Sequence, residues 1–179
     1  MRFDRIHTLV VDDNPHMRRL IAEILRSLGV IHVHEAGDGA EALDVLRRQP
    51  VDIIFTDLSM EPVDGVDFVR LLRNAPDSKA PMTPVIMITG HSTLAKVGEA
   101  RDAGVNEFLS KPITARAVLQ RISWVVDHPR PFIRNEDYFG PDRRRKADPD
   151  YAGPLRRSTD VKPLTPRMPP RLGGKTPDA

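Results

Sequence analysis

Five short segments with strand-like composition, each followed by a polar side chain and then by a helical pattern, constrain the fold of this chain most strongly. The segments cover residues 6–11, 31–35, 51–56, 85–88 and 105–109. The third is continuously apolar, as is typical of a central strand covered on both faces. Regular alternation of strand and helix predicts an α/β fold with a parallel sheet, helices on both faces and right-handed crossovers.

Helical periodicity fills the intervals between these strands. The expected helices cover about residues 15–28, 38–46, 65–72, 92–103 and 118–126. Asn14 and Pro15 supply an N-cap followed by a proline at the first helical position. The fourth helix is weakly apolar and contains Gly98, which costs roughly 1 kcal/mol against alanine inside a helix. Its stability must therefore come mostly from packing.

Composition excludes several classes of protein. The 179 residues include no cysteine, so a disulfide framework and a thiolate metal site are both excluded. The first residues lack the apolar stretch of a signal peptide, and no apolar run is long enough to cross a bilayer. We therefore expect a cytoplasmic protein.

Charge and proline content change sharply near residue 128. Residues 129–179 carry 12 basic and 7 acidic side chains, a net charge of +5, together with 10 of the 17 prolines. Residues 1–128 carry 15 basic and 18 acidic side chains, a net charge of −3. This shift predicts one domain over residues 1–128 and an extended or disordered Pro/Arg-rich tail over residues 129–179.

The tail contains one internal repeat. Residues 138–144 and 151–157 both fit the pattern Tyr-x-Gly-Pro-x-Arg-Arg. The repeat favours a docking segment, whose candidate residues are Tyr138, Arg143, Arg144, Tyr151, Arg156 and Arg157. A solvated charged run is the simpler alternative. Binding of nucleic acid or an anionic surface through this tail is a further alternative, which the seven acids and few aromatics of the tail disfavour.

Polar side chains stand where the predicted strands end. They are Asp12 and Asp13 after the first strand, Asp57 after the third, Thr89 after the fourth and Lys111-Pro112 after the fifth. In an open parallel sheet the carboxyl ends of the strands meet at one edge, where ligands bind. Acids hold a cation, while a hydroxyl and an ammonium group hold anionic oxygens. The set therefore predicts a phosphoryl-transfer site.

Taken singly, these residues have plainer interpretations. Asp12 and Asp13 could merely cap a helix, Asp57 could be a loop acid, Thr89 an N-cap and Lys111 a solvated surface lysine. Two acids before the Asn-Pro cap exceed what capping requires. The five features in order favour the site over these alternatives.

The chain resembles the receiver domain of two-component response regulators over about residues 5–127. The resemblance rests on Asp12-Asp13, Asp57, Asp64-Gly65, Thr89 and Lys111-Pro112, in that order. In layout it is most similar to single-domain chemotaxis regulators. It implies a doubly wound (βα)5 fold with five parallel strands in the order 2-1-3-4-5.

The resemblance also implies a role for each residue. Asp57 would accept a phosphoryl group from a phosphohistidine, while Asp12, Asp13, Asp57 and the Ser59 backbone carbonyl would hold Mg²⁺. Thr89 and Lys111 would bind phosphoryl oxygens, and Phe108 would turn inward on activation. Pro112 would follow a cis peptide bond, and Ser59 and His91 would tune the lifetime of the acyl phosphate. None of these roles follows from spacing alone.

The function implied is that of a phosphorylation-controlled signalling protein, not an enzyme, that assists its own phosphorylation and dephosphorylation. A sensor histidine kinase or a histidine phosphotransfer protein would supply the phosphoryl group. Output would pass to an unidentified protein partner, because the proline-rich tail shows no helical DNA-binding pattern. A phosphate shuttle or sink in a phosphorelay is the alternative.

His32 and His34 alternate with apolar residues and therefore share one face of the second strand. They could begin a metal site, but the sequence offers no third ligand nearby. A polar face on an edge strand is the favoured interpretation.

Overall fold

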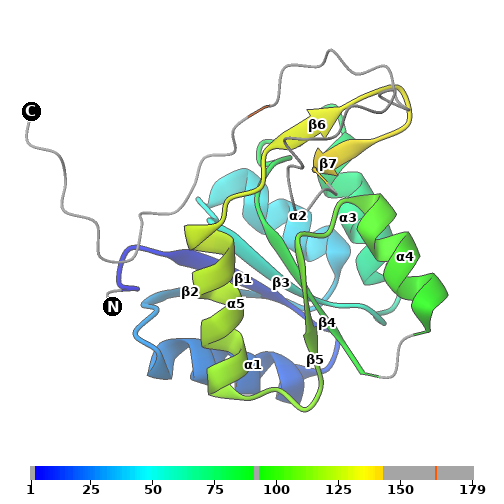
Figure 1. The fold of residues 1–179 in the computed structure, drawn as a ribbon. Helices are drawn as coiled ribbons and strands as arrows, with labels where there is room; N and C mark the ends of the chain where they lie inside the picture. The colour runs from blue at the N-terminus through cyan, green and yellow to red at the C-terminus, as the bar shows by residue number, and fades with distance from the viewer. Residues whose placement is uncertain (1–2, 91–92, 143–163, 165–179) are drawn as a thin grey trace, which may run out of the picture.

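A single parallel sheet organises the chain (Figure 1). The computed structural model describes residues 3–90, 93–142 and 164. The strands are β1 His7–Val11, β2 His32–Ala36, β3 Ile53–Asp57, β4 Val85–Thr89 and β5 Glu107–Ser110, in the order β2-β1-β3-β4-β5. The helices are α1 Pro15–Ser27, α2 Gly39–Arg48, α3 Gly65–Asn74, α4 Leu94–Ala103 and α5 Ala115–Asp127. The doubly wound α/β fold and its strand order are as the sequence and its resemblance predict.

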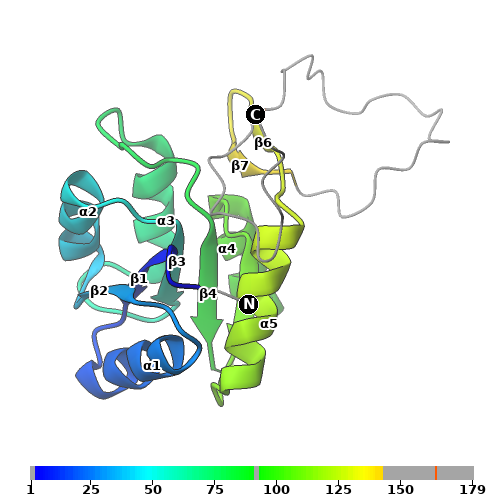
Figure 2. The same ribbon diagram turned by 90° about the vertical axis from the view of Figure 1, so that its left-hand side faces the viewer.

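Two hydrophobic cores lie on opposite faces of the sheet. One packs α2, α3 and α4 against the sheet, and the other packs α1 and α5 (Figure 2). All five residues of β3 and of β4 are buried. These two neighbouring strands lie in the interior of a three-layer sandwich. No helix in the described ranges is long and apolar enough to span a bilayer.

Helix caps fix the loops at the carboxyl edge of the sheet. The Asn14 side chain accepts hydrogen bonds from two N–H groups in the first turn of α1. Asp38 and Asp64 cap α2 and α3, each accepting one hydrogen bond from an N–H group in the first turn. Side-chain caps satisfy N–H groups that a helix leaves unpaired at its start. Each chain reversal after a strand therefore has a defined shape.

The first residues of the tail have more structure than the sequence predicts. The sequence predicts extended or disordered chain from Pro129, but β6 Phe132–Arg134 and β7 Phe139–Pro141 form an antiparallel hairpin. The hairpin packs near the C-terminal ends of α3 and α4, at the end of the sheet opposite the carboxyl edge (Figure 1). Two three-residue strands are too short to produce a visible sequence period. The division of the chain at residue 128 stays a prediction.

A buried arginine lies beneath this hairpin. Arg73 is 1% exposed and donates hydrogen bonds to the carbonyl oxygens of Pro81, Thr83 and Gly104 and to Asn106 Oδ1. Its guanidinium carbon lies 5.0 Å from the centre of the Phe132 ring. Burial lowers the pKa of Arg73 to about 9, although the nearby Tyr138 acts in the opposite direction. The guanidinium thus ties the end of α3 to the loop between α4 and β5.

The first repeat copy has a structural use within the hairpin. The Tyr138 hydroxyl donates to the Pro141 carbonyl oxygen at 2.8 Å. A Cβ atom at Gly140 would lie 2.5 Å from that hydroxyl oxygen and 2.9 Å from Gly104 Cα. The tyrosine and glycine of the motif therefore pack against each other in one turn, and the proline contributes its carbonyl oxygen.

The structure adds a third histidine to the pair on β2. The His7 ring stacks on that of His32 with centroids 4.1 Å apart, and His34 lies 6.1 Å from His7. His7 Nδ1 and His34 Nε2 are buried without a hydrogen-bond partner among the described residues. No group of three or more His, Cys, Asp or Glu side chains in those residues is arranged to hold a metal ion. The polar-face interpretation is retained.

This cluster predicts a pH dependence of stability. Desolvation, followed by the charges of His7 and His32, lowers the pKa of His34 below its ordinary value of 6.5. The unfolded chain therefore binds a proton on His34 more readily than the folded chain does. The contribution of neutral His34 to the free energy of unfolding is complete above pH 6.5 and is lost as the pH falls below this value. Urea unfolding on both sides of pH 6.5 should show a smaller acid-induced loss for His34→Gln than for the wild type. The exposed His16→Gln should behave like the wild type; equal losses in all three proteins would contradict the prediction.

Candidate functional site

The carboxyl edge of the sheet brings together the five polar features predicted there. Asp12 and Asp13 follow β1, Asp57 ends β3, Thr89 ends β4 and Lys111 follows β5. Parallel pairing of β1 with β3, β3 with β4 and β4 with β5 aligns these ends. Residues almost a hundred positions apart thus reach one surface.

Asp57 lies at the centre of the site. It is 5% exposed, and its Oδ1 lies 2.7 Å from the ammonium nitrogen of Lys111. The backbone N–H of Ser59 donates to its Oδ2 at 3.0 Å. An ion pair on one oxygen and a backbone donor on the other orient the carboxylate, although the geometry at Oδ1 is not that of a hydrogen bond.

Asp12 is buried and Asp13 is exposed. Asp12 Oδ1 accepts from the Asn14 N–H at 2.8 Å, while its Oδ2 is buried without a hydrogen-bond partner among the described residues. Burial raises the pKa of Asp12, and the charges of Asp57 and Asp13 act in the same direction. The Asn14 N–H and the charge of Lys111 oppose this shift. The site therefore concentrates negative charge that a cation would stabilise.

Thr89 and Phe108 lie beside this centre. Thr89 is 8% exposed, and its hydroxyl is buried without a hydrogen-bond partner in the described part of the chain. Its carbonyl oxygen accepts from the Lys111 N–H at 2.8 Å, and the Lys111–Pro112 peptide bond is cis. Phe108 is half-buried against the α2–α4 core. The Thr89 hydroxyl is thus an available hydrogen-bond donor beside Lys111 at the carboxyl edge of the sheet.

Gly65 allows α3 to begin directly against Asp57. A Cβ atom at Gly65 would collide with the Asp57 carbonyl oxygen and lie 3.1 Å from its carbonyl carbon. We expect Gly65→Ala to lower the free energy of unfolding by about 1–3 kcal/mol, because backbone must move. Gly98→Ala is the matched control, since a Cβ there meets nothing within 4 Å. This control should stabilise the helix by about 0.5–1 kcal/mol in urea unfolding; equal effects of both changes would contradict the argument.

The remaining predicted residues divide into two groups. Ser59 lies at the site through its backbone N–H, and Tyr138 lies in the hairpin, away from the site. His91, Arg143, Arg144, Tyr151, Arg156 and Arg157 lie outside the described residues. Their roles stay predictions.

Two contacts were not predicted from the sequence. The Glu61 N–H donates to Asp13 Oδ2 at 3.1 Å, which ties the loop after β3 to the end of β1. Arg73 under the hairpin was also missed, although it follows Val69 by four residues and so falls on the buried face of α3. A charged residue on an apolar helix stripe was the available signal.

Comparison with known proteins decides the family. Residues 8–123 match the family described as the response regulator receiver domain. The chain belongs to this receiver family. Its receiver part carries the acidic, hydroxyl and lysine positions described above on the family's characteristic fold, so the resemblance stated from the sequence is confirmed.

Known receivers cover about two thirds of this chain. The chemotaxis protein CheY of Pseudomonas aeruginosa is 36% identical over 119 residues, which are 66% of this chain and 94% of that protein. The structure of CheY4 from Vibrio cholerae has a TM-score of 0.62 and 29% identity, covering 67% of this chain and 98% of that one. The receiver domain of sensor histidine kinase PA1611 from Pseudomonas aeruginosa, solved with magnesium in its active-site cleft, is 32% identical with a TM-score of 0.56. It covers 65% of this chain and 93% of its own.

The donor set of this receiver suits magnesium by its chemistry, although its three carboxylates do not form, among the described residues, a group that could hold a metal ion by themselves. Carboxylate oxygens are the hard ligands that Mg²⁺ takes, and the buried Oδ2 of Asp12 has no other described partner. Asp13 and Asp57 are engaged with the Glu61 N–H and with Lys111, respectively. Magnesium commonly completes its coordination with water, so a few protein oxygens at this edge suffice.

Proposed function

We propose that this receiver accepts a phosphoryl group on Asp57 from a phosphohistidine of a sensor histidine kinase or histidine phosphotransfer protein. The observation that carries the proposal is the 2.7 Å contact between Asp57 Oδ1 and the Lys111 ammonium group. A carboxylate oxygen of Asp57 attacks phosphorus, the phosphorus–nitrogen bond breaks, and an acyl phosphate forms. Lys111 and the Thr89 hydroxyl supply positive charge and a donor for the phosphoryl oxygens.

Magnesium supplies charge neutralisation between the carboxylates and the incoming phosphoryl group. In this proposal Asp12, Asp13, Asp57 and the Ser59 carbonyl hold the ion. Burial, and after it the charges of Asp57 and Asp13, raise the pKa of Asp12; this supports the assignment, because a cation would stabilise the buried carboxylate.

Signalling in this proposal starts with Thr89. Its hydroxyl, which has no hydrogen-bond partner in the described ranges, bonds the new phosphoryl group, and the half-buried Phe108 turns inward in response. Ser59 and His91 tune the lifetime of the acyl phosphate. The altered face engages a protein partner in the cytoplasm, so the chain is a signalling module that assists its own phosphorylation and dephosphorylation.

A phosphorelay shuttle is the second candidate. It is favoured by the likeness to a receiver domain of a sensor histidine kinase, since such a domain belongs to a protein that also carries kinase function. A shuttle would use the same Asp57 site and pass its phosphoryl group onward. It would require no downstream effector.

Phosphorylation of the full chain by acetyl phosphate tests the proposal. Intact mass spectrometry should show one added phosphoryl group with Mg²⁺ and none with a chelator in its place. Absence of the adduct in both conditions would contradict the proposal. Subsequent mixing with a histidine phosphotransfer protein separates the candidates: rapid onward transfer supports the shuttle, and retention of the group supports the signalling module.

A further inference from the structure

The outer edge of β6 contacts a distant part of the chain. Phe132 and Leu164 exchange two backbone hydrogen bonds, each donor lying 2.8 Å from its acceptor. The two residues form an isolated antiparallel bridge, which corresponds to the hydrogen-bonded pair of an antiparallel ladder. Leu164 follows the last described hairpin residue, Asp142, by 22 positions. The bridge is therefore a tertiary contact.

Along β6, successive residues direct their backbone N–H and carbonyl groups alternately toward β7 and away from it, so the outer edge of β6 is available for pairing. On the β7 side, the Asp142 N–H donates to the Pro131 carbonyl oxygen, and Phe132 lies opposite Pro141. Proline has no N–H, so it suits a position where no ladder bond is formed. The N–H and carbonyl groups of Phe132 consequently point away from β7, where a third strand can reach them.

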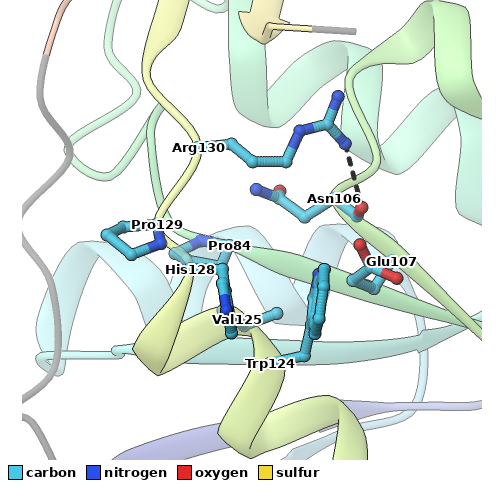
Figure 3. A pocket seen from close by; sticks show the side chains of 8 residues that line it. All are labelled: Pro84, Asn106, Glu107, Trp124, Val125, His128, Pro129 and Arg130. Atoms are coloured by element: carbon cyan, nitrogen blue, oxygen red, sulfur yellow. Dashed lines mark hydrogen bonds between the residues drawn. The ribbon is translucent and has the colours of Figure 1, made fainter. Parts of the chain in front are cut away.

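The hairpin is a firmly anchored platform for such a strand. An isolated two-stranded hairpin is marginally stable in water, but the Phe132 side chain is fully buried over the Arg73 guanidinium. Just after α5, Arg130 donates to the Asn106 carbonyl oxygen, as Figure 3 shows. Trp124 lies beside this exit and stacks on His128. A platform held in place lowers the entropic cost of binding an extended segment.

We infer that the outer edge of β6 is a peptide-binding site that accepts an extended segment by backbone addition, and that the tail segment containing Leu164 is its resident occupant. In strand addition, main-chain hydrogen bonds provide affinity and side-chain contacts provide specificity. Leu164 is 41% exposed, so its side chain is partly buried in this contact. The described contact consists of two backbone hydrogen bonds at one residue, so we expect another extended segment to displace the occupant.

Two prolines lie close to Leu164 in the sequence. Pro163 directly precedes it, and Pro166 lies two residues beyond it. Proline has no backbone N–H, so neither residue can donate a ladder hydrogen bond to an adjacent strand. The site is independent of Asp57 and of the proposed phosphotransfer.

Amide hydrogen exchange of the full chain, followed by NMR at the Phe132 amide, tests the inference. Leu164→Pro removes the donated N–H and should speed exchange at Phe132 by about tenfold or more. Leu164→Ala keeps both backbone groups and should leave the rate close to that of the wild type. Equal rates in the wild type and Leu164→Pro would overturn the inference. Thermal unfolding of each variant verifies that the hairpin platform remains folded.

A synthetic peptide of residues 160–169 then tests the edge as a binding site. Added to the full-length Leu164→Pro chain, it should slow exchange at Phe132 saturably, whereas the same peptide with proline at the Leu164 position should not. No slowing by either peptide would overturn the assignment of a peptide-binding site. In the wild type, protection of the Phe132 amide could rise with protein concentration. That result would show that a second copy of the chain donates the strand, and it would overturn the assignment of the chain's own tail as the occupant.

Discussion

Asp57→Asn is expected to reduce phosphorylation of this receiver by acetyl phosphate and Mg²⁺ to background. The amide has nearly the same shape as the carboxylate, but it offers no anionic oxygen to form an acyl phosphate. It also removes the negative charge that pairs with Lys111 at 2.7 Å. Incorporation is measured by intact mass, with time courses for the variant and the wild type run in parallel.

Asp127→Asn is the matched control for this change. Asp127 is an exposed acid at the end of α5, away from the carboxyl edge of the sheet. Its replacement alters the net charge equally and should leave incorporation unchanged. Persistent incorporation in Asp57→Asn would place the phosphoryl group on another residue, which peptide mass mapping would then locate.

Phe132→Ala is expected to lower the free energy of unfolding by about 3–5 kcal/mol, the range for deleting a buried aromatic ring. Phe132 is 0% exposed and covers the Arg73 guanidinium, so its loss opens a cavity beside a buried charge. Urea unfolding measures the change. Leu94→Ala is the control, because Leu94 is 92% exposed and its truncation should have little effect.

Truncation distinguishes the hairpin from the rest of the tail. A chain ending at Asp142 keeps β6 and β7, whereas a chain ending at His128 loses both and uncovers Arg73. We expect the shorter chain to be the less stable of the two by an amount comparable with Phe132→Ala. Equal stability of the two truncated chains, or equal effects of Phe132→Ala and Leu94→Ala, would show that the hairpin contributes nothing to the receiver.

Local chemistry made the main architecture predictable. Strand composition, helical periodicity and caps such as Asn14 and Asp64 act over a few residues, so each can be identified from neighbouring letters. Parallel topology then required that Asp12, Asp57 and Lys111 share one edge of the sheet. The α4 start is one small difference: the helix begins at Leu94 with Thr93 as its cap, later than the predicted position near residue 92.

The sequence by itself determined the α/β alternation, the strand ends that carry the acids and the lysine, and the family resemblance. Only the tertiary structure decided which oxygen of Asp57 faces Lys111, that His7 joins the histidines of β2, and that Phe132 covers Arg73. These contacts join residues far apart in the chain, and their formation depends on packing and desolvation. Neither effect leaves a periodic signal in a short sequence window, which explains why the hairpin was found only in the folded chain.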